Sequence, residues 1–143
     1  MTYAGDCIFC KFASHEIEPA IVFENDKVLA FLDNNPAGQL VGHTLVLPKK
    51  HYETIDLIPD TTLGEIIKVI KLLVPAIKKV SGAEGINVVQ NNGKVAGQAI
   101  PHAHFHIIPR KRLDGIYFDE KRRKVVPMEQ LETAKAIKEE LKK

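Results

Sequence analysis

The residues best suited to chemistry are three histidines that alternate with apolar residues, in the segment His102-Ala103-His104-Phe105-His106-Ile107-Ile108. Successive side chains of a β-strand point to opposite faces, so in a strand the three imidazoles share one face and the apolar residues the other. The apolar face can pack beneath a helix while the imidazoles face a cleft. Neighbouring imidazoles disfavour one another's protonation, which keeps some of them neutral and nucleophilic near pH 7.

Two kinds of site could use such a row. The first is a catalytic metal ion held by three histidines. Cα atoms two residues apart in a strand are separated by roughly 6.7 Å and those four apart by about 13 Å, so the outer pair reaches a shared ion only at full stretch. The second is nucleophilic catalysis, in which the central imidazole attacks an electrophile while its neighbours hold charge and protons. The spacing favours the second reading, with the metal site as the alternative.

A glycine-containing loop directly before the histidines favours phosphorus as the electrophile. Asn91-Asn92-Gly93 and Gly97-Gln98 supply glycines, which let backbone N–H groups approach a ligand closely, and amide side chains that can bind oxyanions. Most loops of this composition are only turns. The argument therefore depends on the position of this loop immediately before the histidine row.

The two cysteines of the chain form a Cys7-x-x-Cys10 pair near its start. This spacing suits half of a tetrahedral zinc site or a redox pair. A redox motif usually opens a helix in a βαβ unit, and no such pattern follows here. Zinc needs two further ligands, which histidines can supply. The zinc site is the favoured reading, with a redox pair and a pair of no special role as alternatives.

Composition and charge narrow the function classes. The chain has 143 residues, which suits one domain with its own core, and a formal charge of +2. The positive excess lies in the tail from residue 110, so the body lacks the basic surface of a nucleic-acid binder. We recognise no signal peptide and no apolar run of the roughly 20 residues that a membrane helix needs. We therefore expect a cytoplasmic protein that binds neither membranes nor nucleic acid.

The apolar pattern predicts the elements that position these residues. We expect one helix from Asp60 or Thr61 to Ser81-Gly82, kinked at Pro75, and a short helix that begins near Pro127. The expected strands cover residues 21–24, 28–32, 44–47, 86–90 and 102–108. This order predicts an α+β fold, with a five-stranded antiparallel sheet, a central helix and a C-terminal helical tail.

Together, these motifs resemble the histidine triad (HIT) family of nucleotide hydrolases and transferases, especially its Hint-type branch with a CxxC pair. The row has the family's His-φ-His-φ-His-φ-φ pattern, and the resemblance covers about residues 7–110. Its other segments, in order, are Cys7-Ile8-Phe9-Cys10-Lys11, Phe23-Glu24, Leu29-Ala30-Phe31-Leu32-Asp33, Gly42-His43-Thr44-Leu45-Val46-Leu47-Pro48-Lys49-Lys50-His51, Asn91-x-Gly93 and Gly97-Gln98-Ala99. On this basis we expect a HIT-like fold, with a HIT domain at residues 1–112 and a C-terminal extension at 113–143.

The resemblance implies a nucleotide phosphoramidase or nucleoside monophosphate hydrolase that acts at the α-phosphorus of purine nucleotides such as AMP conjugates. His104 would attack the phosphorus and form a covalent nucleotidyl-histidine, which water then cleaves. His106 would hold the phosphate oxygens, while the backbone near His102 would orient the nucleophile. The alternatives are a dinucleoside polyphosphate hydrolase and a non-catalytic nucleotide-binding scaffold.

The family pattern also implies the nucleotide-binding residues. Asn91, Gly97 and Gln98 would bind the phosphate. Asp33 would bind the ribose, and Ile8, Phe9 and Phe31 would enclose the base. Two further positions depart from the pattern. Ala99 stands where many Hint-type members carry Ser or Thr, so it offers the leaving group only a backbone N–H. Asn34 stands where an apolar residue commonly lines the nucleoside pocket, which leaves the base preference open.

In family members with a CxxC pair, a structural zinc ion is held by residues that correspond here to Cys7, Cys10, His51 and His102. The reaction itself would use no metal, and His104 stays available for chemistry. The family generally forms homodimers through the central helix and a strand, so a second copy is the implied partner. The two remaining histidines, His15 and His43, are expected to be structural or solvated.

Overall fold

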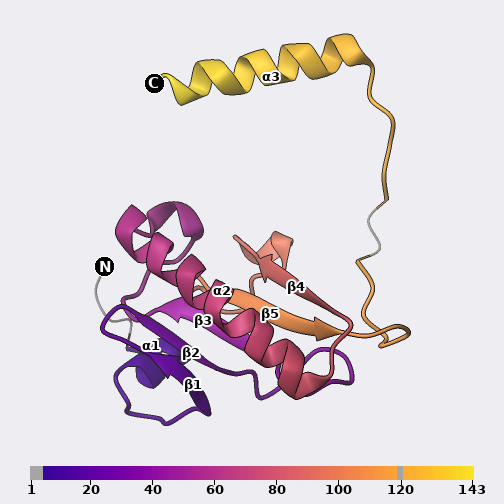
Figure 1. Ribbon diagram of the computed structural model, residues 1–143. Helices are drawn as coiled ribbons and strands as arrows, with labels where there is room; N and C mark the ends of the chain where they lie inside the picture. Colours follow the sequence, from indigo (N-terminus) through magenta and orange to yellow (C-terminus); the bar gives the residue numbers. More distant parts are fainter. Residues whose placement is uncertain (1–4, 119–120) are drawn as a thin grey trace.

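A five-stranded antiparallel sheet, in the spatial order β1-β2-β3-β5-β4, forms the centre of the molecule (Figure 1). The computed structural model describes residues 5–118 and 121–143. The antiparallel sheet and the α+β class predicted from the sequence are confirmed. The strands are β1 (Ile21–Glu24), β2 (Val28–Leu32), β3 (Thr44–Pro48), β4 (Gly85–Gln90) and β5 (Phe105–Arg110).

The central helix α2 (Asp60–Ser81) covers one face of the sheet. Its buried residues Ile66, Val69, Ile70, Leu73 and Ile77 form one core with strand residues that include Ala103, Phe105 and Ile107. The helix ends at Gly82, which adopts φ +70° and donates its N–H to the Lys78 carbonyl. Pro75 lies inside α2, which continues to Ser81.

A short helix that the sequence analysis did not anticipate, α1 (Ile8–Ala13), covers the opposite face. Its buried Phe9 and Phe12 contact Phe31 in edge-to-face geometry, and both belong to a second core with Leu45 and Leu47. Cys7 caps the helix, because its Sγ accepts the N–H of Cys10. The CxxC pair therefore opens a helix after all. The sheet has a core on each face, and the α1 face carries the histidines.

The prediction of a strand over residues 102–108 is wrong at both ends, since β5 begins at Phe105 and continues through Pro109 to Arg110. His102 and His104 precede the strand. The Ala103 N–H donates to the Tyr52 carbonyl at 2.7 Å, and this bond to the loop after β3 replaces sheet pairing. Ala103, Phe105 and Ile107 still share the α2 side, as the alternation predicts.

The start of the C-terminal segment is held to the body by Arg110. The Arg110 guanidinium donates to both carboxylate oxygens of Asp114, at 2.7 and 3.1 Å, and to the Ile116 carbonyl at 2.9 Å. Ile116 in turn lies against Gly38, where a Cβ would meet its Cδ1 at 2.8 Å. Farther on, helix α3 (Pro127–Leu141) begins where it was expected and has no buried residue.

None of the helices within residues 5–118 and 121–143 combines the length and the hydrophobicity that crossing a membrane requires.

The core beneath α2 makes a simple prediction about stability. Ile66 is fully buried there, so Ile66→Ala leaves a cavity and should lower the free energy of unfolding by about 2–5 kcal/mol. Ile17, 41% exposed, is the matched control, and Ile17→Ala should change it by no more than about 0.5 kcal/mol. Urea denaturation followed by circular dichroism measures both, and equal effects would contradict the assigned core.

Candidate active site

His104 is oriented by the backbone of its own segment. Its Nδ1 lies 2.7 Å from the carbonyl oxygen of His102, and that oxygen can only accept a hydrogen bond. Neutral His104 must therefore carry its proton on Nδ1, which leaves the Nε2 lone pair available. His104 also lines the cavity described below, and a lone pair of this kind is what a nucleophilic imidazole needs.

A second hydrogen-bonded series fixes the opposite tautomer in His106. The Ala37 N–H can only donate, and it lies 2.9 Å from His43 Nδ1. Neutral His43 therefore carries its proton on Nε2, which lies 2.9 Å from His106 Nδ1 and donates to it. His106 must then carry its own proton on Nε2. The site thus places the unprotonated Nε2 of His104, an acceptor, beside the protonated Nε2 of His106, a donor. The centroids of the two rings lie 5.0 Å apart.

Burial keeps these rings neutral. It lowers the pKa of His104, although the hydrogen bond to His102 and the nearby charge of Asp33 oppose this effect. Burial, together with His104 and His43, lowers the pKa of His106 to about 4. Burial also lowers the pKa of His43, whose Nε2 lies 3.6 Å from an Asp33 carboxylate oxygen. At pH 7 both series of hydrogen bonds therefore hold neutral rings.

A cavity of about 380 Å³ opens beside His104 and His106. Its walls are mainly apolar with a few polar groups, as the walls of small-molecule sites usually are. Six other residues that the sequence analysis selected line it: Ile8, Phe9, Phe31, Asp33, Asn34 and Ala99. Four further residues complete the lining, and the sequence analysis did not select them: Phe12, Asn35, Leu45 and Ile100.

The loop before the histidines is positioned by Gln98, which does not line this cavity. Gln98 is buried and uses both ends of its amide internally. It accepts the Gly93 N–H at 2.7 Å and donates to the carbonyls of Glu53 and Ile100, at 2.7 and 3.1 Å. Asn91 and Gly97 lie beside each other, also away from the cavity lining. The Gln98 side chain therefore shapes the loop.

His43 was expected to be structural or solvated, and the structure places it, buried, in the hydrogen-bond series between Ala37 and His106. The register of β3 and β5 explains why, because Leu45 pairs with His106 and brings the start of β3 beside the histidine row. Only the pairing of these two strands reveals this proximity, and the pairing is not readable from local patterns.

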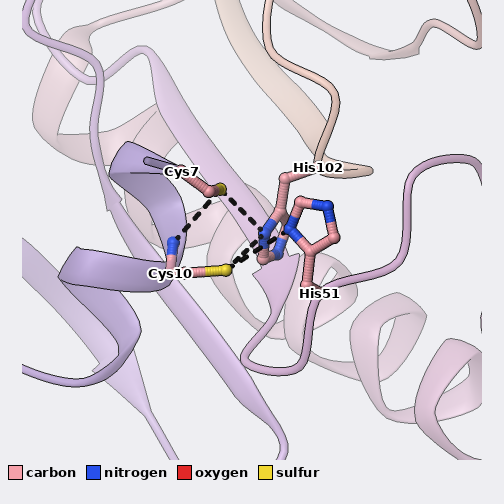
Figure 2. Close-up of side chains that lie close together, drawn as sticks. All are labelled: Cys7, Cys10, His51 and His102. Atoms are coloured by element: carbon pink, nitrogen blue, oxygen red, sulfur yellow. Dashed lines mark hydrogen bonds between the residues drawn. The ribbon is translucent and has the colours of Figure 1, made fainter. Parts of the chain in front are cut away.

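Two cysteines and two histidines meet on the α1 side of the row (Figure 2). Cys10 Sγ lies 3.3 Å from His51 Nδ1 and 3.6 Å from His102 Nδ1, and Cys7 Sγ lies 3.5 Å from the same His102 atom. All four ligand atoms lie within 4.8 Å of one another. With Zn–S near 2.3 Å and Zn–N near 2.0–2.1 Å, a tetrahedral site has S···N edges of about 3.5 Å. The donor set therefore fits a metal ion of this kind.

His102 is prepared as a ligand by its second nitrogen. Its Nε2 lies 2.8 Å from the Pro48 carbonyl and so carries the proton, which leaves Nδ1 to face the two sulfur atoms. Such a hydrogen bond from the outer nitrogen is usual for metal-binding histidines. Burial lowers the pKa of His102 to about 4, so the ring is neutral.

Fold and site together define a class of protein, in which an antiparallel α+β sheet carries a row of alternating histidines beside an apolar cavity. The HIT domain family model matches residues 14–113, and the chain belongs to the HIT family. It is 54% identical over 109 residues to the "Uncharacterized HIT-like protein MJ0866" of Methanocaldococcus jannaschii, across 76% of this chain and 82% of that protein. It is 39% identical to the "Adenosine 5'-monophosphoramidase HNT1" of Candida albicans, across 78% and 74%.

Solved structures agree with this family. The crystal structure of SMU.412c from Streptococcus mutans superposes with a TM-score of 0.91 at 32% identity, over 97% of this chain and 87% of that one. The histidine triad nucleotide-binding protein from Candida albicans superposes with a TM-score of 0.86 at 35% identity, over 95% and 97%. The predicted HIT-like fold is confirmed.

The lowered pKa of His106 predicts how stability depends on pH. An unfolded histidine takes up a proton near pH 6.5, whereas folded His106 does so only near pH 4. Between these values the unfolded state binds more protons, so acidification removes stability. Replacing His106 by Gln should therefore make the unfolding free energy fall less steeply from pH 7 to pH 5. The decrease in slope should correspond to at most one proton taken up on unfolding.

The control for this experiment is His15, whose pKa is raised by Glu24 and Glu18 on the exposed surface. A raised pKa stabilises the folded state as the pH falls, so His15→Gln should make the same curve steeper. Denaturant titrations at each pH measure all three proteins. Curves for the wild type and His106→Gln that run parallel would show that His106 is not shielded from protonation.

Proposed function

We propose that this protein is a nucleotide phosphoramidase or nucleoside monophosphate hydrolase that acts at the α-phosphorus of purine nucleotides, with AMP conjugates as the main class. The observation that carries the proposal is the pair of opposite tautomers at His104 and His106 beside a cavity of nucleoside size. The family membership supports it, and so does the monophosphoramidase name of the Candida albicans relative.

In the proposed first step, His104 Nε2 attacks the α-phosphorus while the bond to the leaving group breaks with its electron pair. The new N–P bond makes the imidazole cationic. The His102 carbonyl, which already accepts the Nδ1 proton at 2.7 Å, stabilises that charge. Water then attacks the phosphorus and the N–P bond breaks, so that AMP leaves and His104 returns to its neutral form; the proton that the water loses balances the one that the leaving group takes from solvent.

His106 would act on the phosphate oxygens in both steps. Its Nε2 proton is directed away from His43, whose own Nε2 proton occupies the other nitrogen of His106. A donor held in this way stabilises charge that develops on the oxygens without having to reorient. The proposed phosphate contacts of Gly97 and Gln98 come from their backbone N–H groups, because the Gln98 amide is already used inside the loop.

The nucleoside would occupy the rest of the cavity. We assign the purine to the apolar wall made by Ile8, Phe9 and Phe31, and the ribose hydroxyls to the Asp33 carboxylate. Asn34 adds an amide at the rim, which can discriminate between bases through hydrogen bonds. At the leaving-group side, Ala99 contributes only its backbone and a methyl group.

We infer that the Cys7, Cys10, His51 and His102 cluster holds a structural zinc ion. The S···N separations and the Pro48 hydrogen bond support this assignment. Bound there, zinc would supply only a cross-link between α1, the loop after β3 and the residues before β5. No step of the reaction uses it, but His102 carries the carbonyl that orients His104.

We further propose a cytoplasmic homodimer. The edge strand β4 pairs with β5 on one side only, and its Val88 is 48% exposed. Helix α2 exposes Ile67 on one flank and Leu72 and Val80 on the other. Pairing of two β4 edges would continue the sheet across two copies and cover part of this apolar surface.

The proposed nucleophile is tested by His104→Ala. Hydrolysis of a fluorogenic AMP phosphoramidate should fall by about 10⁴-fold or more, because the neighbouring His106 carries its proton on Nε2 and offers no lone pair there. Acid quenching with radiolabelled substrate should trap AMP on the wild-type protein and none on the variant. His15→Ala, on a distant surface, should retain full turnover. AMP labelling that survives in His104→Ala would overturn the mechanism.

The zinc assignment is tested by Cys10→Ser. Elemental analysis should find about one zinc ion per chain in the wild type and in the control Ser14→Ala, and little in Cys10→Ser. The melting temperature of Cys10→Ser should drop clearly, because the cross-link is lost. Its turnover at temperatures where it stays folded should fall less than tenfold. A selective loss of kcat at an unchanged melting temperature would contradict a structural role.

A further inference from the structure

Helix α3 has an apolar side that nothing in its own chain covers, within residues 5–118 and 121–143. Leu131, Ala134, Ile137 and Leu141 fall within about a third of the helix circumference at 100° per residue. The three larger side chains are 69%, 57% and 80% exposed, respectively. Figure 1 shows α3 lying apart from the sheet and from α2.

A helix of 15 residues without packing partners is at best marginally stable in water. Isolated helices shorter than about 12–15 residues are marginal in water, and most helices in proteins are stabilised by packing of their apolar side. A tethered helix without contacts would also take no fixed position relative to the body. If α3 has a fixed position relative to the body, a surface outside this chain must therefore hold it there.

The solved structures indicate that the place is a fixed one. Residues 121–143 make up about a sixth of the chain, so a superposition that left them out could reach a TM-score of only about 0.84. The Streptococcus mutans and Candida albicans structures exceed this value, at 0.91 and 0.86. Proteins that share only 32% and 35% of their residues with this chain therefore hold their C-terminal helices in an equivalent position.

We propose that α3 is an exchanged arm, which docks its Leu131–Ile137 side on the body of a second copy of this chain. The second copy is the favoured occupant because two distant relatives, from a bacterium and a yeast, hold the helix in the same detached position. Two-fold symmetry then lets each copy give one arm and receive one. The exposed side chains Leu72 and Val80 lie about 80° apart around α2 and provide an apolar surface to receive it. The proposal does not depend on the enzymatic activity.

Amide hydrogen exchange of the full-length protein tests the docking. With the protein at micromolar concentration, amides in peptides from residues 127–141 should exchange about 10²-fold more slowly than those of an undocked helix. Dilution of the protein should remove this protection. Ile137→Asp should abolish the protection, because it places a charge in the contact. Ala136→Asp adds the same charge on the opposite side of α3 and should keep most of it. Fast exchange in the wild type, or the same response in both variants, would overturn the proposal.

Isotope mixing identifies the occupant. Equal amounts of unlabelled and ¹⁵N-labelled protein are mixed, equilibrated and treated with a lysine cross-linker, which can join Lys135 or Lys138 of α3 to Lys68 or Lys71 of α2. Exchanged arms should give mixed-label pairs in about half of these α3–α2 cross-links. Pairs of one label only would show that α3 folds back on its own body and would contradict the exchange. Protection without any α3–α2 cross-link would reject α2 as the receiving surface.

Discussion

The hydrogen bond between His104 Nδ1 and the His102 carbonyl, 2.7 Å long, is the interaction on which the candidate site depends. It selects the His104 tautomer that leaves the Nε2 lone pair available, as the proposed nucleophile requires. The bond forms because residues 102–104 leave the sheet, with the Ala103 N–H bound to Tyr52 instead of a neighbouring strand. The His102 ring is held on its two nitrogens by Pro48 and by the cysteine–histidine cluster. A structural metal at that cluster would thus act on the chemistry only by holding this carbonyl still.

Burial supplies the second requirement, since the Nε2 lone pair of His104 and the acceptor Nδ1 of His106 are available only on neutral rings. The sheet, α1 and the loop that contains Ala37 exclude water from His43 and His104, and the pKa values of both fall. The position of His43 depends in turn on the pairing of β3 with β5. The apolar core on the α1 face therefore has two roles, as a wall of the cavity and as the medium that keeps the imidazoles unprotonated.

The sequence allowed much of this to be predicted, for identifiable reasons. Periodicity located all five strands and α2, and the alternation of Ala103, Phe105 and Ile107 placed the histidines on the correct face. Eight of the residues selected for the site line one cavity. The errors arose where tertiary contacts override local pattern: α1 depends on a cysteine cap and on packing against Phe31, and β5 begins late because Tyr52 takes the Ala103 N–H. The role of His43 depends on strand register, which no local pattern records.

The opposite tautomers of His104 and His106 are the central claim, and nitrogen NMR observes them directly. Long-range ¹H–¹⁵N spectra of the histidine-labelled protein at pH 7, assigned by single substitutions, distinguish a protonated Nδ1 from a protonated Nε2. The account predicts a proton on Nδ1 of His104 and on Nε2 of both His43 and His106. A proton on Nε2 of His104, or a cationic His106 at this pH, would contradict it.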